Sequence, residues 1–178
     1  MSKALTQLFT LALALISAGC AHPVSVSTQY DAHANFAGMR TFAWSAESDS
    51  QGDGDRALRP EMSRHVRSEV EAALSAKGLH KSESANADAI VAFTAAVDHQ
   101  HQVISMYSPK PGGGTPRASE WVAVFDLGTL TITLSDRTSG QPVWFSSAQA
   151  EIEQGGVEGQ VSAAISKMLS GFPPSPRR

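Results

Sequence analysis

Several stretches of the chain alternate hydrophobic and polar residues in the way that predicts β-strands. The alternation is clearest at residues 24–30 and 129–134, and a period of two is typical of a strand with one buried face. The third predicted strand is apolar on both faces, so we expect it in the middle of the sheet. The predicted strands are residues 24–30, 41–44, 88–98, 121–134 and 142–152.

Two other segments carry apolar residues at helical spacing. Val66, Val70 and Leu74 recur every four residues, which places them on one face of a helix. Pro60 suits the first turn of that helix, and Gly78 stands where a C-terminal cap belongs. The second helix is expected between residues 156 and 171, and its apolar stripe comprises Val161, Ile165, Met168 and Leu169.

These elements follow the order β-β-α-β-β-β-α. Each helix has one apolar stripe and most strands have one apolar face, so the two helices can cover one face of a sheet. The pattern therefore predicts an α+β two-layer sandwich, with a largely antiparallel sheet of about five strands. This domain should span residues 24–174 and leave residues 175–178 as a tail.

Two parts of the predicted sheet are irregular. Residues 99–120 hold several prolines and a run of three glycines, which predicts a long loop that is either mobile or functional. In the fourth strand, the alternation extended backwards would place Asp126 on the inward face. A bulge or break near Gly128 would relieve that conflict.

The N-terminus has the layout of a secretory signal peptide. Lys3 precedes an uncharged apolar run at residues 8–16, and small residues follow it. The apolar run is too short for a transmembrane helix, which needs about 20 apolar residues. The sequence therefore predicts that residues 1–19 are removed.

The residues Ile16-Ser17-Ala18-Gly19-Cys20 resemble the lipobox of bacterial lipoproteins. That resemblance implies cleavage between Gly19 and Cys20 and acyl chains on Cys20, with residues 20–23 as a tether. Ser17 departs from the pattern, which usually has Leu there, and cleavage by the general signal peptidase is the alternative. Ala21 takes a position where some lipoproteins carry an inner-membrane Asp, which favours the outer membrane, facing the periplasm.

Composition narrows the classes of partner. The formal net charge is −3, and a mildly acidic chain without basic runs is a poor candidate for nucleic acid or for charge-driven lipid binding. Cys20 is the single cysteine, so its acylation would leave no thiol for disulfide or cysteine chemistry.

Several short motifs lie in a fixed order along the chain. They are Tyr30-Asp31, Thr41-Phe42-Ala43-Trp44, Ala87-Asp88-Ala89-Ile90-Val91-Ala92-Phe93, Gly128-Thr129-Leu130-Thr131-Ile132, Gly140-Gln141-Pro142-Val143-Trp144 and Phe172-Pro173-Pro174. Together they resemble the DUF4136 family of bacterial lipoproteins over roughly residues 24–174. The resemblance implies an anchored single-domain envelope protein. The family is named for lacking a known function, so it supplies no catalytic residues.

No catalytic or cofactor motif emerges from the sequence. It contains no G-x-S-x-G nucleophile elbow, and its glycine run lacks the lysine of a phosphate-binding loop. His99 and His101 would share one side of a strand and are the weak candidates for a metal site, but zinc needs three or four ligands. Polar residues at the end of a strand are the simpler interpretation.

Tyr107 and Trp121 bracket the predicted loop and are weak candidates for contact with a partner protein or glycan. A core position for Trp121 and an ordinary surface position for Tyr107 are the alternatives. The sequence thus favours a non-enzymatic binding or structural module of the cell envelope without a cofactor. An unfamiliar enzyme acting on peptidoglycan or lipid, and a metal-capturing protein, are the other hypotheses.

Overall fold

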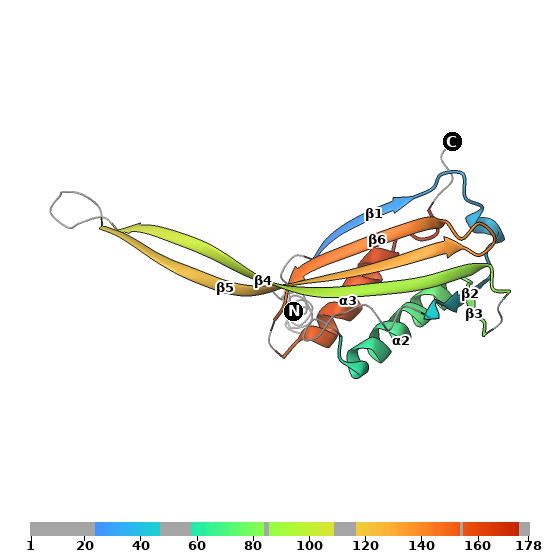
Figure 1. The fold of residues 1–178 in the computed structure, drawn as a ribbon, viewed down its shortest axis with the longest axis horizontal. Helices are drawn as coiled ribbons and strands as arrows, with labels where there is room; N and C mark the ends of the chain where they lie inside the picture. The colour runs from blue at the N-terminus through green and yellow to red at the C-terminus, as the bar shows by residue number, and fades with distance from the viewer. Residues whose placement is uncertain (1–23, 47–57, 84–85, 109–116, 154, 175–178) are drawn as a thin grey trace, which may run out of the picture.

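Six strands form one mixed sheet in the order β1-β6-β5-β4-β2-β3, and two helices cover one of its faces (Figure 1). The computed structural model describes residues 24–46, 58–83, 86–108, 117–153 and 155–174, with side chains omitted at residues 106–108 and 117–119. The elements are β1 (Ser25–Tyr30), η1 (Phe36–Gly38), β2 (Thr41–Trp44), α2 (Pro60–Ala76), β3 (His80–Lys81), β4 (Ala89–Ser108), β5 (Arg117–Asp136), β6 (Pro142–Glu151) and α3 (Val157–Leu169).

The predicted fold class, an α+β sheet with two helices, is confirmed. The strand that the sequence did not predict is β3, which pairs with β2 through two residues only, Thr41↔His80 and Phe42↔Lys81. Two residues are too few to produce a visible alternation. β2 runs parallel to β3 and β4, while β4, β5, β6 and β1 are antiparallel neighbours. The parallel pair of β2 and β4 requires a crossover, which α2 supplies.

The core lies between the helices and the covered face of the sheet. On α2 the buried side chains are Val66, Val70 and Leu74, the stripe that the sequence predicted. On α3 they are Ala164, Ile165, Met168 and Leu169. From the sheet, the largest fully buried side chains are Phe42, Val91, Ile132, Leu134 and Trp144.

The predicted loop at residues 99–120 was wrong for most of its length. β4 and β5 each have 20 residues and pair without a break from Ala89↔Asp136 to Ser108↔Arg117. Beyond the helices this hairpin projects from the domain, as the left-hand part of Figure 1 shows. Hydrophobic alternation reports burial of one face, so it fades where no helix covers the strands. The glycines and prolines at residues 109–116 lie outside the described residues.

The predicted bulge near Gly128 was also wrong. Val97↔Gly128 and His99↔Asp126 continue the same register, and the irregularity in β5 lies instead between Leu134 and Ser135, against β6. Gly128 has another role: a Cβ there would meet Ile152 Cγ1 at 3.2 Å. The missing side chain therefore lets Ile152 lie directly on β5.

Candidate functional site

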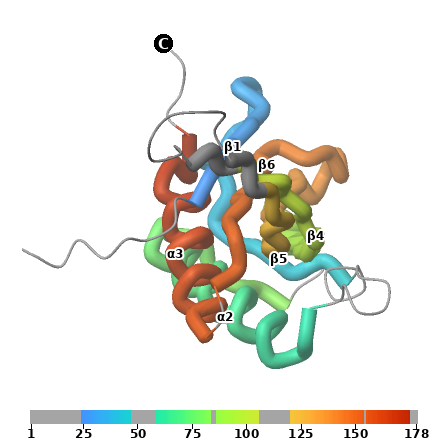
Figure 2. The backbone as a smooth tube through the Cα atoms, turned by 90° about the vertical axis from the view of Figure 1, so that its left-hand side faces the viewer, coloured from blue at the N-terminus to red at the C-terminus, as the bar shows by residue number. Residues whose placement is uncertain are grey.

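The projecting part of the hairpin, residues 99–108 and 117–126, is named the arm. Its rungs run from His99↔Asp126 to Ser108↔Arg117. β6 pairs with β5 only as far as Leu127↔Glu151, and Ile152 N donates to the Asp126 carbonyl at 2.8 Å. Beyond that first rung, the strands of the arm pair only with each other within the described chain. Figure 2, a view along the long axis, shows the strands of the arm, β4 and β5, to the right of α2 and α3.

Each face of the arm continues one face of the sheet. Side chains alternate along a strand, and directly paired residues share a face. Phe93 is buried beneath the helices, so the residues at even spacing from it lie on the continuation of the helix-covered face. On that face the described side chains are His99, His101, Val103 and Ser105 of β4, paired with Asp126, Val124, Val122 and Glu120 of β5.

Three valines on this face form an apolar surface, the valine patch (Val103, Val122 and Val124). Their side chains are 64%, 58% and 62% exposed. Val103 and Val122 are direct cross-strand partners, and Val124 is next to Val122 on the same face. Within the domain, positions on this face are covered by α2 and α3, whereas no described helix covers the arm. Contiguous exposed apolar side chains are typical of an interaction surface.

The opposite face of the arm carries an aromatic pair. Trp121 is the direct partner of Ile104 and is 44% exposed. Phe125, four residues further along the strand and on the same face, is half-buried. The alternative that Trp121 is a core residue was therefore wrong. Its exposure on the arm agrees with its candidacy for partner contact, which stays a prediction.

The other candidate residues have mixed positions. Tyr107 pairs with Ala118 in the arm, and its side chain is not among those described. Gly19 and Cys20, the predicted cleavage and lipidation site, lie outside the described residues, as do the signal peptide and residues 175–178. Neither described helix has the length and apolar character that a membrane span requires.

The two histidines share a face, as predicted, but have different neighbours. His99 Nδ1 forms a hydrogen bond with Asp126 Oδ1 across the strands, whereas the cross-strand partner of His101 is Val124. In the part of the chain that the structure describes, no group of three or more His, Cys, Asp or Glu side chains could hold a metal ion. Asp126, which seemed misplaced in the sequence, is explained by this pair with His99.

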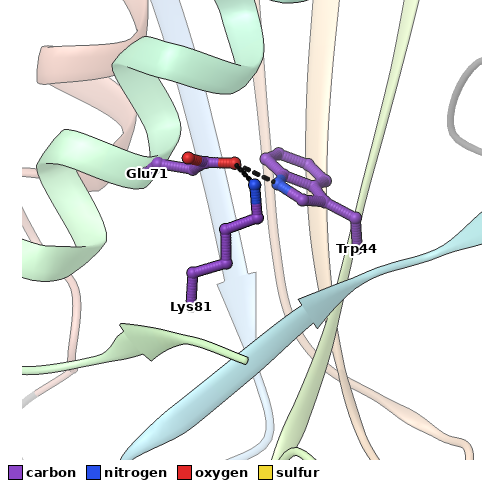
Figure 3. Close-up of polar contacts among 3 residues, drawn as sticks. All are labelled: Trp44, Glu71 and Lys81. Atoms are coloured by element: carbon purple, nitrogen blue, oxygen red, sulfur yellow. Dashed lines mark hydrogen bonds and ion pairs between the residues drawn. The ribbon is translucent and has the colours of Figure 1, made fainter. Parts of the chain in front are cut away.

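A polar cluster lies between α2 and the neighbouring strands β2 and β3 (Figure 3). Glu71 Oε1 accepts a hydrogen bond from Trp44 Nε1 at 2.8 Å and lies 2.7 Å from Lys81 Nζ. Burial would raise the pKa of Glu71, but the hydrogen bonds from Lys81 and Trp44 outweigh it and lower that pKa. The Arg67 guanidinium lies 4.5 Å from the Trp44 ring centroid. These contacts join α2 to β2 and β3, so their role is structural.

Asp88 holds the start of β2 against β4. Its Oδ2 accepts hydrogen bonds from Arg40 N, Thr41 N and Thr41 Oγ1, all at 2.9 Å. In return, Asp88 N donates to Thr41 Oγ1 at 3.0 Å. The backbone hydrogen bond from Arg40, followed by the bonds from Thr41, lowers the pKa of Asp88. Two of the ordered sequence motifs, at residues 41–44 and 87–93, thus meet at one structural joint.

Comparison with known proteins defines the class. The model of the family described as "Domain of unknown function (DUF4136)" matches residues 26–174, so the chain belongs to the DUF4136 family. No curated protein matches the sequence significantly.

Solved structures resemble the chain at low sequence identity. A PDZ domain protein from Parabacteroides distasonis has a TM-score of 0.56 and 14% identity, and the match covers 86% of this chain but only 36% of that one. The PelC dodecamer from Paraburkholderia phytofirmans has a TM-score of 0.49 and 17% identity, covering 83% of this chain and 96% of that one. A DUF4136 family protein from Bacteroides thetaiotaomicron has a TM-score of 0.48 and 18% identity, covering 86% and 96%. These likenesses concern the fold.

Sequence reasoning missed the valine patch and Phe125. The available signal was the run Trp121-Val122-Ala123-Val124-Phe125, which is apolar on both faces of a strand. Such a run usually indicates a strand buried on both sides. Here it belongs to the part of β5 that no described helix covers, so the same pattern occurs on an exposed surface.

Proposed function

We propose that this protein is a non-enzymatic binding module of the bacterial cell envelope, anchored by acyl chains on Cys20, that contacts a protein partner through the arm. The observation that carries the proposal is the valine patch. Three well-exposed valines lie side by side on the arm, and none of the described side chains of the arm belongs to the core. Burial of this surface by a partner would remove apolar area from water, the main driving force of association.

The anchor is supported by the sequence. One acyl chain gives only reversible membrane binding, whereas two or three chains hold a protein permanently. A lipobox cysteine carries at least two. The residue after Cys20 is Ala21 rather than Asp, which favours the outer membrane and a domain that faces the periplasm.

A protein partner fits the chemistry of the arm better than a lipid surface. Among the described side chains of the arm, the carboxylates are Glu120 and Asp126, and no Lys or Arg accompanies them. Anionic lipid surfaces attract basic residues, so charge does not favour that target. The arm also offers strand edges without a described neighbour, to which an extended segment of another protein can add. Apolar side chains beside such an edge are typical of protein recognition.

Site-specific photocrosslinking in intact cells tests this function. A photoreactive amino acid at position 122 should crosslink to one protein species, and Val103→Glu in the same chain should abolish that product. The matched control is the same photoreactive residue at position 163, an exposed site on α3, which should not give the product. Crosslinks from position 122 to lipid alone, or the same product from both positions, would refute the arm as the contact surface.

The anchor is tested separately. Intact-mass analysis of the mature protein should show an N-terminal Cys20 with added acyl mass. Cys20→Ser should remain an unprocessed precursor. Normal maturation of that variant would show that the general signal peptidase processes the chain.

A further inference from the structure

An apolar cavity of about 110 Å³ lies at the base of the arm, where the helical layer ends. Elements far apart in the sequence converge on it: the start of β1, the N-terminal half of α2, the middle of β4 and β5, the end of β6 and the first turns of α3. Among the side chains that line it are Val24, Leu58, Met62, Val97, Ile152 and Val161.

The lining offers almost no polar chemistry. Gln149 and Glu151 line it from exposed positions on β6. Gln160 also lines it, but its amide is engaged in hydrogen bonds to the backbone. Its Nε2 donates to the Glu151 carbonyl at 3.1 Å, and its Oε1 accepts from Glu153 N at 3.2 Å. Among the described residues, no lysine or arginine lines the cavity. Its size is comparable with an engineered apolar cavity of about 150 Å³ that stays dry and binds benzene. Hydrocarbon is therefore the chemical class that fits.

We infer that this cavity holds the end of one acyl chain carried by Cys20 of the same molecule. The inference rests on the acylation in the proposed function. Val24 lines the cavity and follows Cys20 by four residues, a span of at most about 14 Å when fully extended. Val24 is itself held in place, because its carbonyl accepts a hydrogen bond from Lys167 Nζ at 2.6 Å. An acyl chain attached at Cys20 is thus tethered within reach of the cavity.

Two physical arguments favour a tethered chain over a free lipid. A free fatty acid would bring a carboxylate, for which the lining supplies no counter-ion, whereas the acyl chain of a lipidated cysteine ends in a covalent bond. Tethering through a short linker also gives an effective concentration on the order of millimolar. The remaining acyl chains of Cys20 would stay in the bilayer and keep the protein anchored.

Metabolic labelling with a diazirine-bearing palmitate tests the assignment in native membranes. After irradiation, we expect a crosslink between the acylated N-terminal peptide and the peptides that contain Ile152 or Val161. Val161→Phe and Ala164→Leu, which both fill the cavity, should reduce this crosslink several-fold. The matched control Ala163→Leu adds the same side chain at the neighbouring exposed position of α3 and should leave the crosslink unchanged. Circular dichroism checks that each variant is folded.

The alternative results are distinguishable. Acylated protein whose label reaches only membrane lipid would overturn this inference while leaving the anchor intact. A second control adds free diazirine palmitate to wild-type protein with ordinary acyl chains. If this protein crosslinks equally well, a free lipid occupies the cavity, and the inference of a tethered acyl chain is overturned. An N-terminal peptide without any acyl mass would overturn both the anchor and the occupant.

Discussion

A pair of valine substitutions in one strand tests whether the arm is independent of the core. Val91 and Val103 both belong to β4 and lie on the same face of the sheet, but Val91 is fully buried under the helices and Val103 is 64% exposed. Replacing each valine by alanine removes the same two methyl groups in the same backbone conformation. The loss of strand propensity, at most about 1 kcal/mol, is therefore similar at the two positions, and the difference between the variants reports burial.

The magnitudes follow from that burial. At Val91 the lost transfer free energy is about 0.8 kcal/mol per methyl group, and the cavity left behind adds to it. A loss of about 2–3 kcal/mol in the free energy of unfolding is expected. At Val103 solvent replaces the methyl groups, and about 0.5 kcal/mol is expected, as for other exposed positions. For a domain of this size, 1 kcal/mol corresponds to roughly 2–4 °C in Tm. Val91→Ala should therefore lower Tm by about 4–12 °C, and Val103→Ala by at most about 2 °C.

The assay is thermal unfolding of the two variants and the wild-type protein, followed by circular dichroism under identical conditions. Urea unfolding of the same samples gives the free energies directly. If Val103→Ala lost as much stability as Val91→Ala, the valine patch would be covered in solution, and the reasoning that makes it a partner surface would be refuted. A loss below 1 kcal/mol at Val91 would contradict the core itself.

Three further perturbations test local features. Gly78 has φ of +88° at the end of α2, so Gly78→Ala should cost about 1 kcal/mol in urea unfolding, whereas Gly159→Ala, at an open position in α3, should be neutral or stabilise by up to about 1 kcal/mol. Equal effects would contradict both backbone assignments. The pKa of Glu71 is lowered in the folded state, so its contribution to the free energy of unfolding is complete above its unfolded pKa and is lost as the pH falls through the folded value. Glu71→Gln should therefore flatten the loss of stability below about pH 4.5. An unchanged dependence of stability on pH in that range would contradict this. Asp88→Ala should speed amide hydrogen exchange at Thr41, and unchanged protection there would show that Asp88 does not hold β2.

The sequence predicted the elements whose patterns result from burial. Both helices and the core strands have an apolar face because they pack against each other, so the periods of 3.6 and 2 marked them correctly. The cap at Gly78 was also predicted, since a positive φ leaves a recognisable residue type. The same reasoning failed where burial is absent. Residues 99–108 form a regular strand that none of the described helices covers, and their mixed polar and apolar pattern resembles that of a loop.

The candidate site was predicted only in part. Trp121 and Tyr107, the two aromatic candidates, both lie on the arm, and their role in partner contact stays a prediction. The run at residues 121–125 marked an apolar strand, but its exposure could not be predicted, since exposed and buried valines look identical in sequence. At Asp126 the sequence suggested an irregularity that the structure does not have. Its charge at an inward register position suggested a bulge, whereas the register continues and the inward face is simply open to solvent beside His99.

The pairing of β4 with β5 makes the length and the orientation of the arm separately adjustable. At about 3.3 Å per residue, residues 99–108 extend about 30 Å beyond the domain, comparable with the hydrocarbon thickness of a bilayer. Removing two residues from each strand would shorten this span by about 7 Å and keep the valines on their present side. Removing one residue from each strand would turn them to the other side. Natural length variation in this hairpin should therefore occur in even steps if the side that the valines face matters.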